Sequence, residues 1–221
     1  MNTSPSISED RGIEILNIND LLVYSVGVST GGLAEMKMVK KNLRTKVVAT
    51  TLDLEGAKSA RINILNNSLD GRVEIKIEDI TKPLPYKNGT FDYIYARLVL
   101  HYLSEKKLIV ALAEIYRMLK TNGKIFIVVR SNQCHQATQV GASYDHESHM
   151  TSYEETDELG NKFKIRRFFH SEESIERYIE QVGFTIDFIE RYDEILYKDF
   201  ARTIPSPYVD ELIGVAAYIT D

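Results

Sequence analysis

"LLVYSVGVSTGGLAEM", residues 21–36, is a short apolar run that breaks at a glycine and passes, through a glycine pair, into a helix-like segment. This is the order in which a buried β-strand leads into a helix around a small-molecule cofactor in α/β proteins. The apolar run contains no acidic residue, and a serine stands in the middle of the turn. The stretch predicts a strand, a turn and a helix, and the identity of the cofactor becomes the question.

Strand-like and helix-like segments alternate along the chain after residue 20. Apolar or β-branched runs predict strands, and apolar residues at helical spacing predict helices. The predicted strands are 21–26, 46–53, 72–77, 91–96 and 124–129, and the predicted helices are 32–42, 56–67 and 104–119. Such alternation indicates βαβ units, in which helices cover both faces of a mostly parallel sheet.

The end of the chain departs from this alternation. Residues 171–183 predict an amphipathic helix that ends at Gly183. Residues 184–197 and 211–220 then predict two strands without a helix between them, which indicates an antiparallel pair at a sheet edge. The predicted fold is a single α/β domain, a three-layer sandwich with about seven strands, the last of them antiparallel.

Two segments lie outside the pattern. Residues 1–19 are polar and irregular, and we expect them to form an N-terminal arm or capping segment before the domain of residues 20–221. Residues 131–169 have almost no apolar periodicity, except that 151–169 predict a hairpin turning at Leu-Gly-Asn. An insertion near the carboxyl ends of parallel strands is placed to cover a binding site, so we expect 131–169 to form a mobile lid.

Composition limits the function classes. The chain has 221 residues and a formal net charge of −5, which argues against broad contact with nucleic acid or an anionic membrane. Its single cysteine, Cys134, cannot form an internal disulfide or a thiolate cluster. No secretory signal is recognised and no apolar run approaches the about 20 residues of a membrane span, so we expect a cytoplasmic protein. Nothing in the sequence determines its oligomeric state.

Three kinds of cofactor turn can be compared with residues 27–32. A P-loop needs a lysine after its last glycine, but Leu33 follows Gly32 here. A dinucleotide fingerprint needs three glycines at fixed offsets, and Ser29 would meet the pyrophosphate, which argues against a nucleotide-dependent oxidoreductase. The third kind binds S-adenosylmethionine, which has no phosphate. It needs a close backbone approach, a carboxylate for the ribose and a polar group for the adenine.

The chain offers those groups in order. The turn follows the first strand, Asp53 ends the second strand where it is placed to accept from ribose hydroxyls, and Asp79 follows the third. Each acid also has a structural interpretation: Asp53 is equally suited to cap the next helix, and Asp79 to cap the turn before Pro83. For Asp79 the context favours the ligand role.

Residues 77–103 hold the most specific motif. They contain Asp79, Leu84-Pro85, "NGTFD" at 88–92 and Leu100-His101. This order resembles the class I S-adenosylmethionine-dependent methyltransferases, especially those that act on small molecules. Residues 119–129 and 168–186 resemble that family's fifth strand with its preceding turn and its later helix with the sixth strand. The resemblance covers roughly residues 20–130 and 168–220 and leaves 131–169 outside.

The resemblance implies a Rossmann-like sheet, S-adenosylmethionine as cofactor, S-adenosylhomocysteine as product and methyl transfer to an unidentified small molecule. It implies that Gly27 and Gly31 form the cofactor turn, with Ser29 at the position of the middle glycine. It also implies that Asp79 binds the adenine amino group.

Three further residues are implied to line the cofactor. Ile80 would lie beside the adenine ring. Ala96 and Arg97 fall where the fourth strand passes the methionine part of the ligand.

The turn departs from the family in its polar residues. Ser25 occupies the position of an acidic residue, and an ungapped match places Thr51 at the ribose carboxylate with Asp53 two residues later, on the same strand face. These departures support an alternative, a catalytically silent relative that binds S-adenosylmethionine or a protein partner. If the turn keeps the family's geometry, replacing Ser25 by Asp and Ser29 by Gly should tighten donor binding.

The sequence does not single out one catalytic residue. His101 and Tyr102 at the strand–helix junction and Tyr144 or His149 in the lid are candidate bases, while His101 is equally suited to packing. The loop histidines show no metal-ligand spacing, so no metal site is expected.

Two adjacent arginines follow the predicted hairpin. Arg166 and Arg167 are usually a surface pair, yet Arg167 would share an apolar strand face with Ile165 and Phe169. An arginine on such a face is a candidate anchor for a carboxylate or phosphate.

Overall fold

The fold is built on a seven-stranded sheet in the order β3-β2-β1-β4-β5-β10-β9. The computed structural model describes residues 6–29, 31–156, 160–197 and 204–220. Neighbouring strands from β3 to β5 run parallel, and β10 runs antiparallel to both β5 and β9. The strands are β1 (Leu22–Val26), β2 (Lys46–Thr51), β3 (Val73–Ile77), β4 (Phe91–Arg97), β5 (Leu119–Arg130), β9 (Thr185–Tyr197) and β10 (Pro205–Tyr218). The predicted sheet, with its antiparallel last strand, is confirmed.

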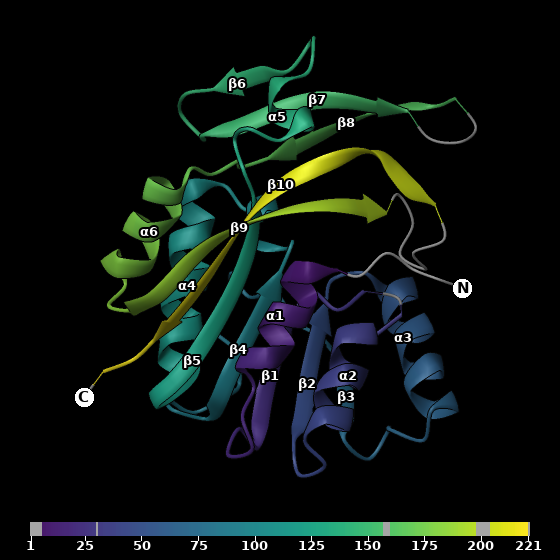
Figure 1. The fold of residues 1–221 in the computed structure, drawn as a ribbon, viewed down its shortest axis with the longest axis vertical. Coiled ribbons are helices and arrows are strands. Elements are labelled where there is room, and N and C mark those ends of the chain that lie inside the picture. The colour runs from purple at the N-terminus through teal and green to yellow at the C-terminus, as the bar shows by residue number, and fades with distance from the viewer. Residues whose placement is uncertain (1–5, 30, 157–159, 198–203, 221) are drawn as a thin grey trace.

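Helices cover both faces of this sheet (Figure 1). One layer contains α1 (Ile7–Ile15), α2 (Leu33–Lys41) and α3 (Leu54–Asn66), and the other contains α4 (Glu105–Met118) and α6 (Glu172–Gln181). The two cores follow strand alternation, since Val23 and Tyr93 point into the first layer while Tyr24 and Ile94 point into the second. The strands are apolar on both sides because each side is buried.

Residues 7–15, which the sequence placed in an N-terminal arm or capping segment of irregular structure, form a helix. Helix α1 packs directly on the sheet at Gly12, where a Cβ atom would lie 2.5 Å from Phe126 and 2.6 Å from Tyr95. The Tyr93 hydroxyl donates a hydrogen bond of 2.7 Å to the Gly12 carbonyl. The sequence does not predict this helix, because it has a central glycine and few apolar residues. The same glycine permits the helix to approach the sheet closely.

The insertion after β5 forms a second, small sheet. It contains α5 (His135–Thr138) and the antiparallel strands β6 (Ser143–Asp145), β7 (Met150–Thr156) and β8 (Lys162–Arg167). The predicted hairpin is the β7–β8 pair, and part of its turn lies outside the described residues. A small core of Cys134, Tyr153 and Phe169 supports this sheet, which lies beyond the carboxyl ends of the main strands (Figure 1). Its regular structure was not predicted beyond the hairpin, and its action as a lid stays a prediction.

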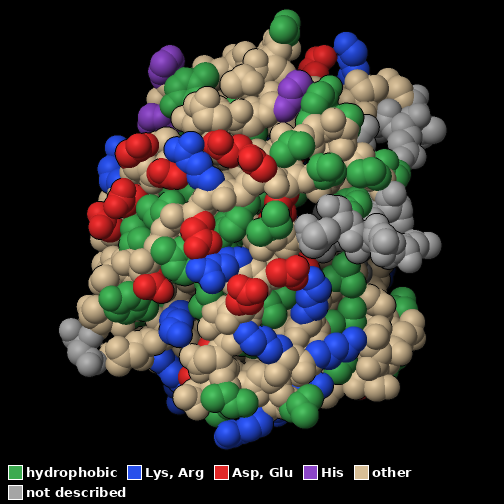
Figure 2. All heavy atoms as spheres, viewed as in Figure 1, with side chains coloured by type: hydrophobic (Ala, Val, Ile, Leu, Met, Phe, Trp, Pro, Cys, Tyr) green, Lys and Arg blue, Asp and Glu red, His purple; other side chains and the backbone are tan. Residues whose placement is uncertain are grey.

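The surface in view has a mixed charge. Figure 2 shows acidic and basic side chains interspersed over this face, among the residues that are described. Within the same described residues, no helix is long and apolar enough to cross a membrane.

Candidate functional site

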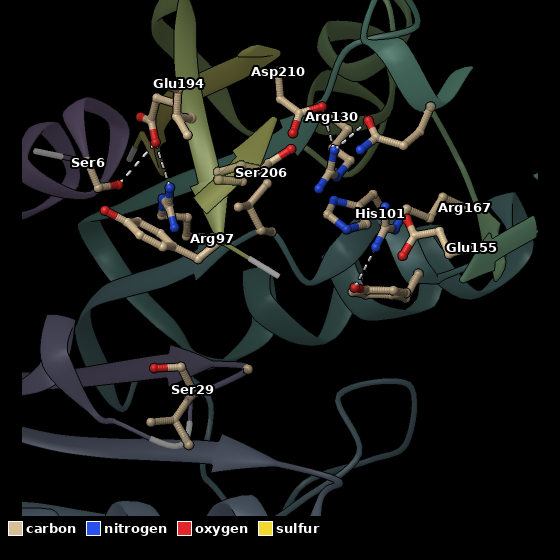
Figure 3. Close-up of a pocket in the computed structure, with 18 residues that line it drawn as sticks. Ser6, Ser29, Arg97, His101, Arg130, Glu155, Arg167, Glu194, Ser206 and Asp210 are labelled. Carbon is tan, nitrogen blue, oxygen red and sulfur yellow. Dashed lines mark hydrogen bonds and ion pairs between the residues drawn. The ribbon is translucent and has the colours of Figure 1, made fainter. Parts of the chain in front are cut away.

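A cavity of about 320 Å³ opens at the carboxyl ends of β1 and β4. Its walls come from the turn after β1, the 3₁₀ helix η1 (Leu100–Tyr102), the small sheet, and strands β9 and β10. Figure 3 shows charged side chains from these elements pointing toward one another across it. A topological switch between β1 and β4 is the usual binding position in open α/β sheets.

The turn after β1 forms one wall of the cavity, where Gly27, Val28 and Ser29 line it. The N–H groups of Gly27 and Val28 both donate to the Thr50 carbonyl, at 2.9 and 2.7 Å. Gly27 has a φ of +80°, and a Cβ atom there would lie 2.7 Å from the side chain of Val99. Only glycine fits this position, because both the backbone and the neighbouring loop exclude a side chain.

The far end of the turn is held by α3. The carbonyl of Gly31 accepts a hydrogen bond from the Asn63 amide. Gly32, with a φ of +57°, is the N-cap residue of α2. Gly27 and Ser29 therefore line the cavity, while Gly31 links the turn to the helix layer.

A carboxylate lies under the turn although β1 contains none. Ser25 is 1% exposed and Glu35 of α2 is 3% exposed. The Ser25 hydroxyl donates a 2.6 Å hydrogen bond to Glu35 Oε1. The family that the sequence resembles has an acidic residue at the position of Ser25. In this protein the carboxylate beside that position comes from Glu35, ten residues later in the helix. An acidic residue in the first turn of a predicted helix was the available signal.

Asp53 acts as the N-cap of α3. Its Oδ1 accepts from the Glu55 N–H at 3.1 Å, and its own N–H donates to Thr51 Oγ1 at the same distance. It is exposed and lies outside the cavity lining. The capping interpretation is therefore seen directly, and the ribose role of Asp53 or Thr51 stays a prediction.

Asp79 and Ile80 follow β3, on the same edge of the sheet but outside the cavity lining. Asp79 Oδ1 accepts from the hydroxyl and N–H of Thr81 at 2.7 and 3.0 Å. The Thr81 hydroxyl is the main reason that the pKa of Asp79 is lowered, with Lys82 contributing. Ile80 and Ala96 are both buried in the same core cluster. Their cofactor roles stay predictions.

Arg97 lines the cavity but is engaged within the protein. Its Nη2 donates to Glu194 Oε2 at 2.7 Å and its Nε donates to Ser8 Oγ at 2.9 Å. Glu194 also accepts from the Ser8 N–H and the Ser6 hydroxyl. This network joins β4, β9 and the start of α1 (Figure 3), and sequence spacing does not reveal a partner 97 residues away.

His101 and Tyr102 both line the cavity. His101 is 1% exposed, and its pKa lies well below its ordinary value, first because of burial and then because Arg167 and Arg130 are near. The imidazole is therefore neutral at pH 7. Its Nδ1 is buried with no hydrogen-bond partner among the described residues. A neutral imidazole that lines a cavity can accept a proton from a ligand.

A buried ion pair forms the opposite wall. Arg130 Nη1 donates to Asp210 Oδ1 at 2.8 Å and to Gln136 Oε1 at 2.9 Å. Burial raises the pKa of Asp210, against the opposing effect of Arg130. None of the three was a sequence candidate, since they lie on β5, α5 and β10 and meet only in the fold.

Tyr144 and His149 lie outside this cavity. The Tyr144 hydroxyl is 2.6 Å from His149 Nδ1, and His149 Nε2 is 3.3 Å from Glu105 Oε2 on α4. The two side chains link the small sheet to α4, so the structure brings only two of the four candidate bases to the cavity. Within the described residues, no group of three His, Cys, Asp or Glu could hold a metal ion.

Comparison with known proteins connects this geometry to a family. Residues 24–127 match the family model described as a methyltransferase domain. These residues contain the glycine turn, Asp79 and the whole of η1. No curated protein matches the chain by sequence.

Solved structures share the complete fold at low identity. An S-adenosylmethionine-dependent methyltransferase from Methanosarcina mazei is 14% identical with a TM-score of 0.72, over 94% of this chain and 96% of that one. The CcbJ methyltransferase from Streptomyces caelestis is 13% identical, with a TM-score of 0.72 over 98% and 91%.

A third solved structure contains bound ligands. Geranyl diphosphate C-methyltransferase from Streptomyces coelicolor, determined with Mg²⁺, geranyl diphosphate and S-adenosylhomocysteine, is 13% identical with a TM-score of 0.66, over 96% of this chain and 78% of that one. At these identities the likeness establishes a shared fold.

Proposed function

Because the chain carries a class I S-adenosylmethionine-dependent methyltransferase domain, we propose that it transfers the methyl group of S-adenosylmethionine to a small molecule. One observation carries the proposal. The glycine turn after β1 and the buried, neutral His101 open onto the same cavity of about 320 Å³. A donor at the turn and an acceptor at His101 would therefore share one cavity.

The residues present fit the donor. Gly27 brings backbone to the cavity wall without a side chain, and Ser29 adds a small hydroxyl that suits the donor's carboxylate. We assign the methionine end to this turn, the adenine amino group to Asp79 and the ribose to Asp53 or Thr51. When bound, the donor supplies a sulfonium methyl that a nucleophile attacks in line.

The chain's own groups orient the acceptor and accept its proton. His101 is the candidate base, because its neutral imidazole can take a proton from a hydroxyl or amine of the acceptor. The Arg97–Glu194 and Arg130–Asp210 pairs hold the walls in place. Enclosure by the small sheet removes water from the nucleophile.

Calorimetry with S-adenosylmethionine, S-adenosylhomocysteine and NAD tests the donor. We expect S-adenosylmethionine and S-adenosylhomocysteine to bind and NAD not to bind. No binding of either at millimolar concentration would refute the proposal, and NAD binding would favour an oxidoreductase.

Transfer is then tested with methyl-labelled donor and mass spectrometry of a small-molecule mixture. The variant His101→Asn should keep donor affinity and lower the labelling rate by about 10²-fold or more. Donor binding with no labelled product from any mixture would support the catalytically silent alternative instead.

A further inference from the structure

Arg167 is a buried cation without a buried counter-charge. It lies at the end of β8, is 7% exposed and lines the cavity beside His101 (Figure 3). Among the described residues, no carboxylate oxygen lies within 4.0 Å of its guanidinium. The other two arginines of the cavity, Arg97 and Arg130, each have a carboxylate partner at 2.7 and 2.8 Å. A buried charge normally has a partner, because desolvation is otherwise uncompensated.

Two tyrosines fix the guanidinium in place. Its Nη1 donates to the Tyr153 hydroxyl and its Nη2 donates to the Tyr102 hydroxyl, the latter at 3.1 Å. The guanidinium carbon lies 5.2 Å from the Tyr102 ring centre and 5.7 Å from that of Tyr153. These contacts orient the group without neutralising it.

Donor capacity remains for a ligand. A guanidinium has five N–H donors, and the two tyrosines account for one on each Nη atom. The Nε of Arg167 is buried and has no hydrogen-bond partner among the described residues. Three N–H groups of the guanidinium are therefore unpaired, and a planar carboxylate can accept from two such groups in a fork.

The charges around the cavity favour a monoanion. Two of the three arginines are neutralised by Glu194 and Asp210. Glu155, half-buried on β7, lines the same cavity beyond ion-pair distance of Arg167. A phosphate monoester would bring up to two negative charges toward one open cation and these acids. A carboxylate brings one.

We propose that the acceptor of this enzyme is a small carboxylic acid whose carboxylate binds Arg167, which places the rest of the molecule against His101 and the glycine turn. This assignment rests on the proposed methyl transfer. Arg167 is a binding residue here, with Tyr102 and Tyr153 as its positioning residues. Glu155 repels the same carboxylate and weakens its binding.

Calorimetry without donor tests the anchor independently of the methyl-transfer proposal. The probes are a panel of small aromatic and aliphatic monocarboxylates, each compared with its own primary amide, and phenyl phosphate as the dianion. We expect carboxylates to bind at least about tenfold more tightly than the matching amides. Arg167→Gln should remove this preference, and Arg167→Lys should retain part of it.

Arg166 supplies a matched control on the same strand. Its side chain is 53% exposed and pairs with Asp145 on the opposite face of the small sheet. Arg166→Gln should leave carboxylate binding unchanged. Glu155→Gln should tighten binding of carboxylates by about two- to tenfold and leave the amides unaffected.

Several results would overturn the inference. They are equal affinity for carboxylates and amides, stronger binding of phenyl phosphate, equal binding by wild type and Arg167→Gln, or no effect of Glu155→Gln. The last variant decides the matter if Arg167→Gln does not fold. Binding of S-adenosylhomocysteine is measured on the same proteins. If S-adenosylhomocysteine binds but carboxylates are not preferred over amides, the assignment of Arg167 as a carboxylate anchor is refuted and the methyltransferase proposal is not. If carboxylates are preferred but S-adenosylhomocysteine does not bind, the methyltransferase proposal is refuted and the carboxylate anchor is not.

Discussion

Replacing Ser25 by Asp should destabilise the protein, although sequence comparison predicts that it restores the cofactor turn. The reason is Glu35, whose buried carboxylate already accepts a hydrogen bond from Ser25. An aspartate on the strand would bring a second carboxylate into the same closed space. One of the two must then remain charged against the other or take up a proton.

The cost can be estimated in two ways. The oxygens of Ser25 and Glu35 are now 2.6 Å apart. Two like charges about 4 Å apart at an effective dielectric constant of about 20 repel by about 4 kcal/mol. Protonating a carboxyl of pKa about 4 at pH 7 costs about the same, at about 1.4 kcal/mol per pH unit. Either route removes about 3–4 kcal/mol from a free energy of unfolding that is typically about 5–15 kcal/mol.

Urea unfolding at pH 7 and pH 5 measures the effect. Ser25→Asn is the matched control, because asparagine has the size of aspartate without its charge. The free energy of unfolding should fall less than half as much in Ser25→Asn as in Ser25→Asp. The exchange Ser25→Asp/Glu35→Ser moves the single carboxylate to the strand and should regain most of the loss. The deficit of Ser25→Asp should shrink to about 1–2 kcal/mol at pH 5, where protonation is easier. Equal stability of wild type and Ser25→Asp at pH 7 would refute the reasoning, as would equal loss in Ser25→Asn.

Three further predictions concern the turn, the adenine contact and the buried His170. Gly27→Ala should cost about 2–5 kcal/mol in urea unfolding, because a left-handed φ of +80° is combined with a contact of 2.7 Å to Val99. Gly141→Ala, with a φ of +88° and open space, should cost only about 1–2 kcal/mol, and equal losses would contradict the contact argument. Asp79→Ala should weaken S-adenosylhomocysteine binding about fivefold by calorimetry through loss of one net hydrogen bond; unchanged affinity would remove Asp79 from the site. Burial lowers the pKa of His170 from 6.5 to about 3. The contribution of the neutral, buried imidazole to the free energy of unfolding is therefore complete above pH 6.5, and it falls by about 1.4 kcal/mol for each pH unit below 6.5. His170→Asn should flatten the acid side of the stability curve by that slope, and an identical slope would show that His170 is not buried in its neutral form.

The fold was predictable because its local patterns agree with its topology. Five apolar strands alternate with amphipathic helices, and the two final strands lack a helix between them, which led to the antiparallel β10. Helix α1 was missed because its glycine, which lets it contact Phe126, lowers its predicted helix propensity. The small sheet was seen only as one hairpin because β6 is three residues long and entirely exposed.

The lining of the candidate cavity was predictable where residues belong to a continuous motif, while their roles stay predictions. Gly27, Ser29, Arg97 and His101 line the cavity as elements of the turn and of β4 with its following loop. Arg130 and Asp210 were not found, since their pairing joins residues 80 positions apart and depends on the position of β10 next to β5. Tyr144 and His149 were placed near the site because the insertion was expected to cover it, but they face α4 at Glu105.

The central claim is that the turn after β1 holds a methyl donor in the cavity that His101 and Arg167 line. A structure of the protein with S-adenosylhomocysteine bound tests it most directly. We predict that the amino-acid end of the ligand contacts Gly27 and Ser29, with its sulfur facing His101 across the cavity. Ligand bound elsewhere on the protein, or no bound ligand at millimolar concentration, would contradict this account.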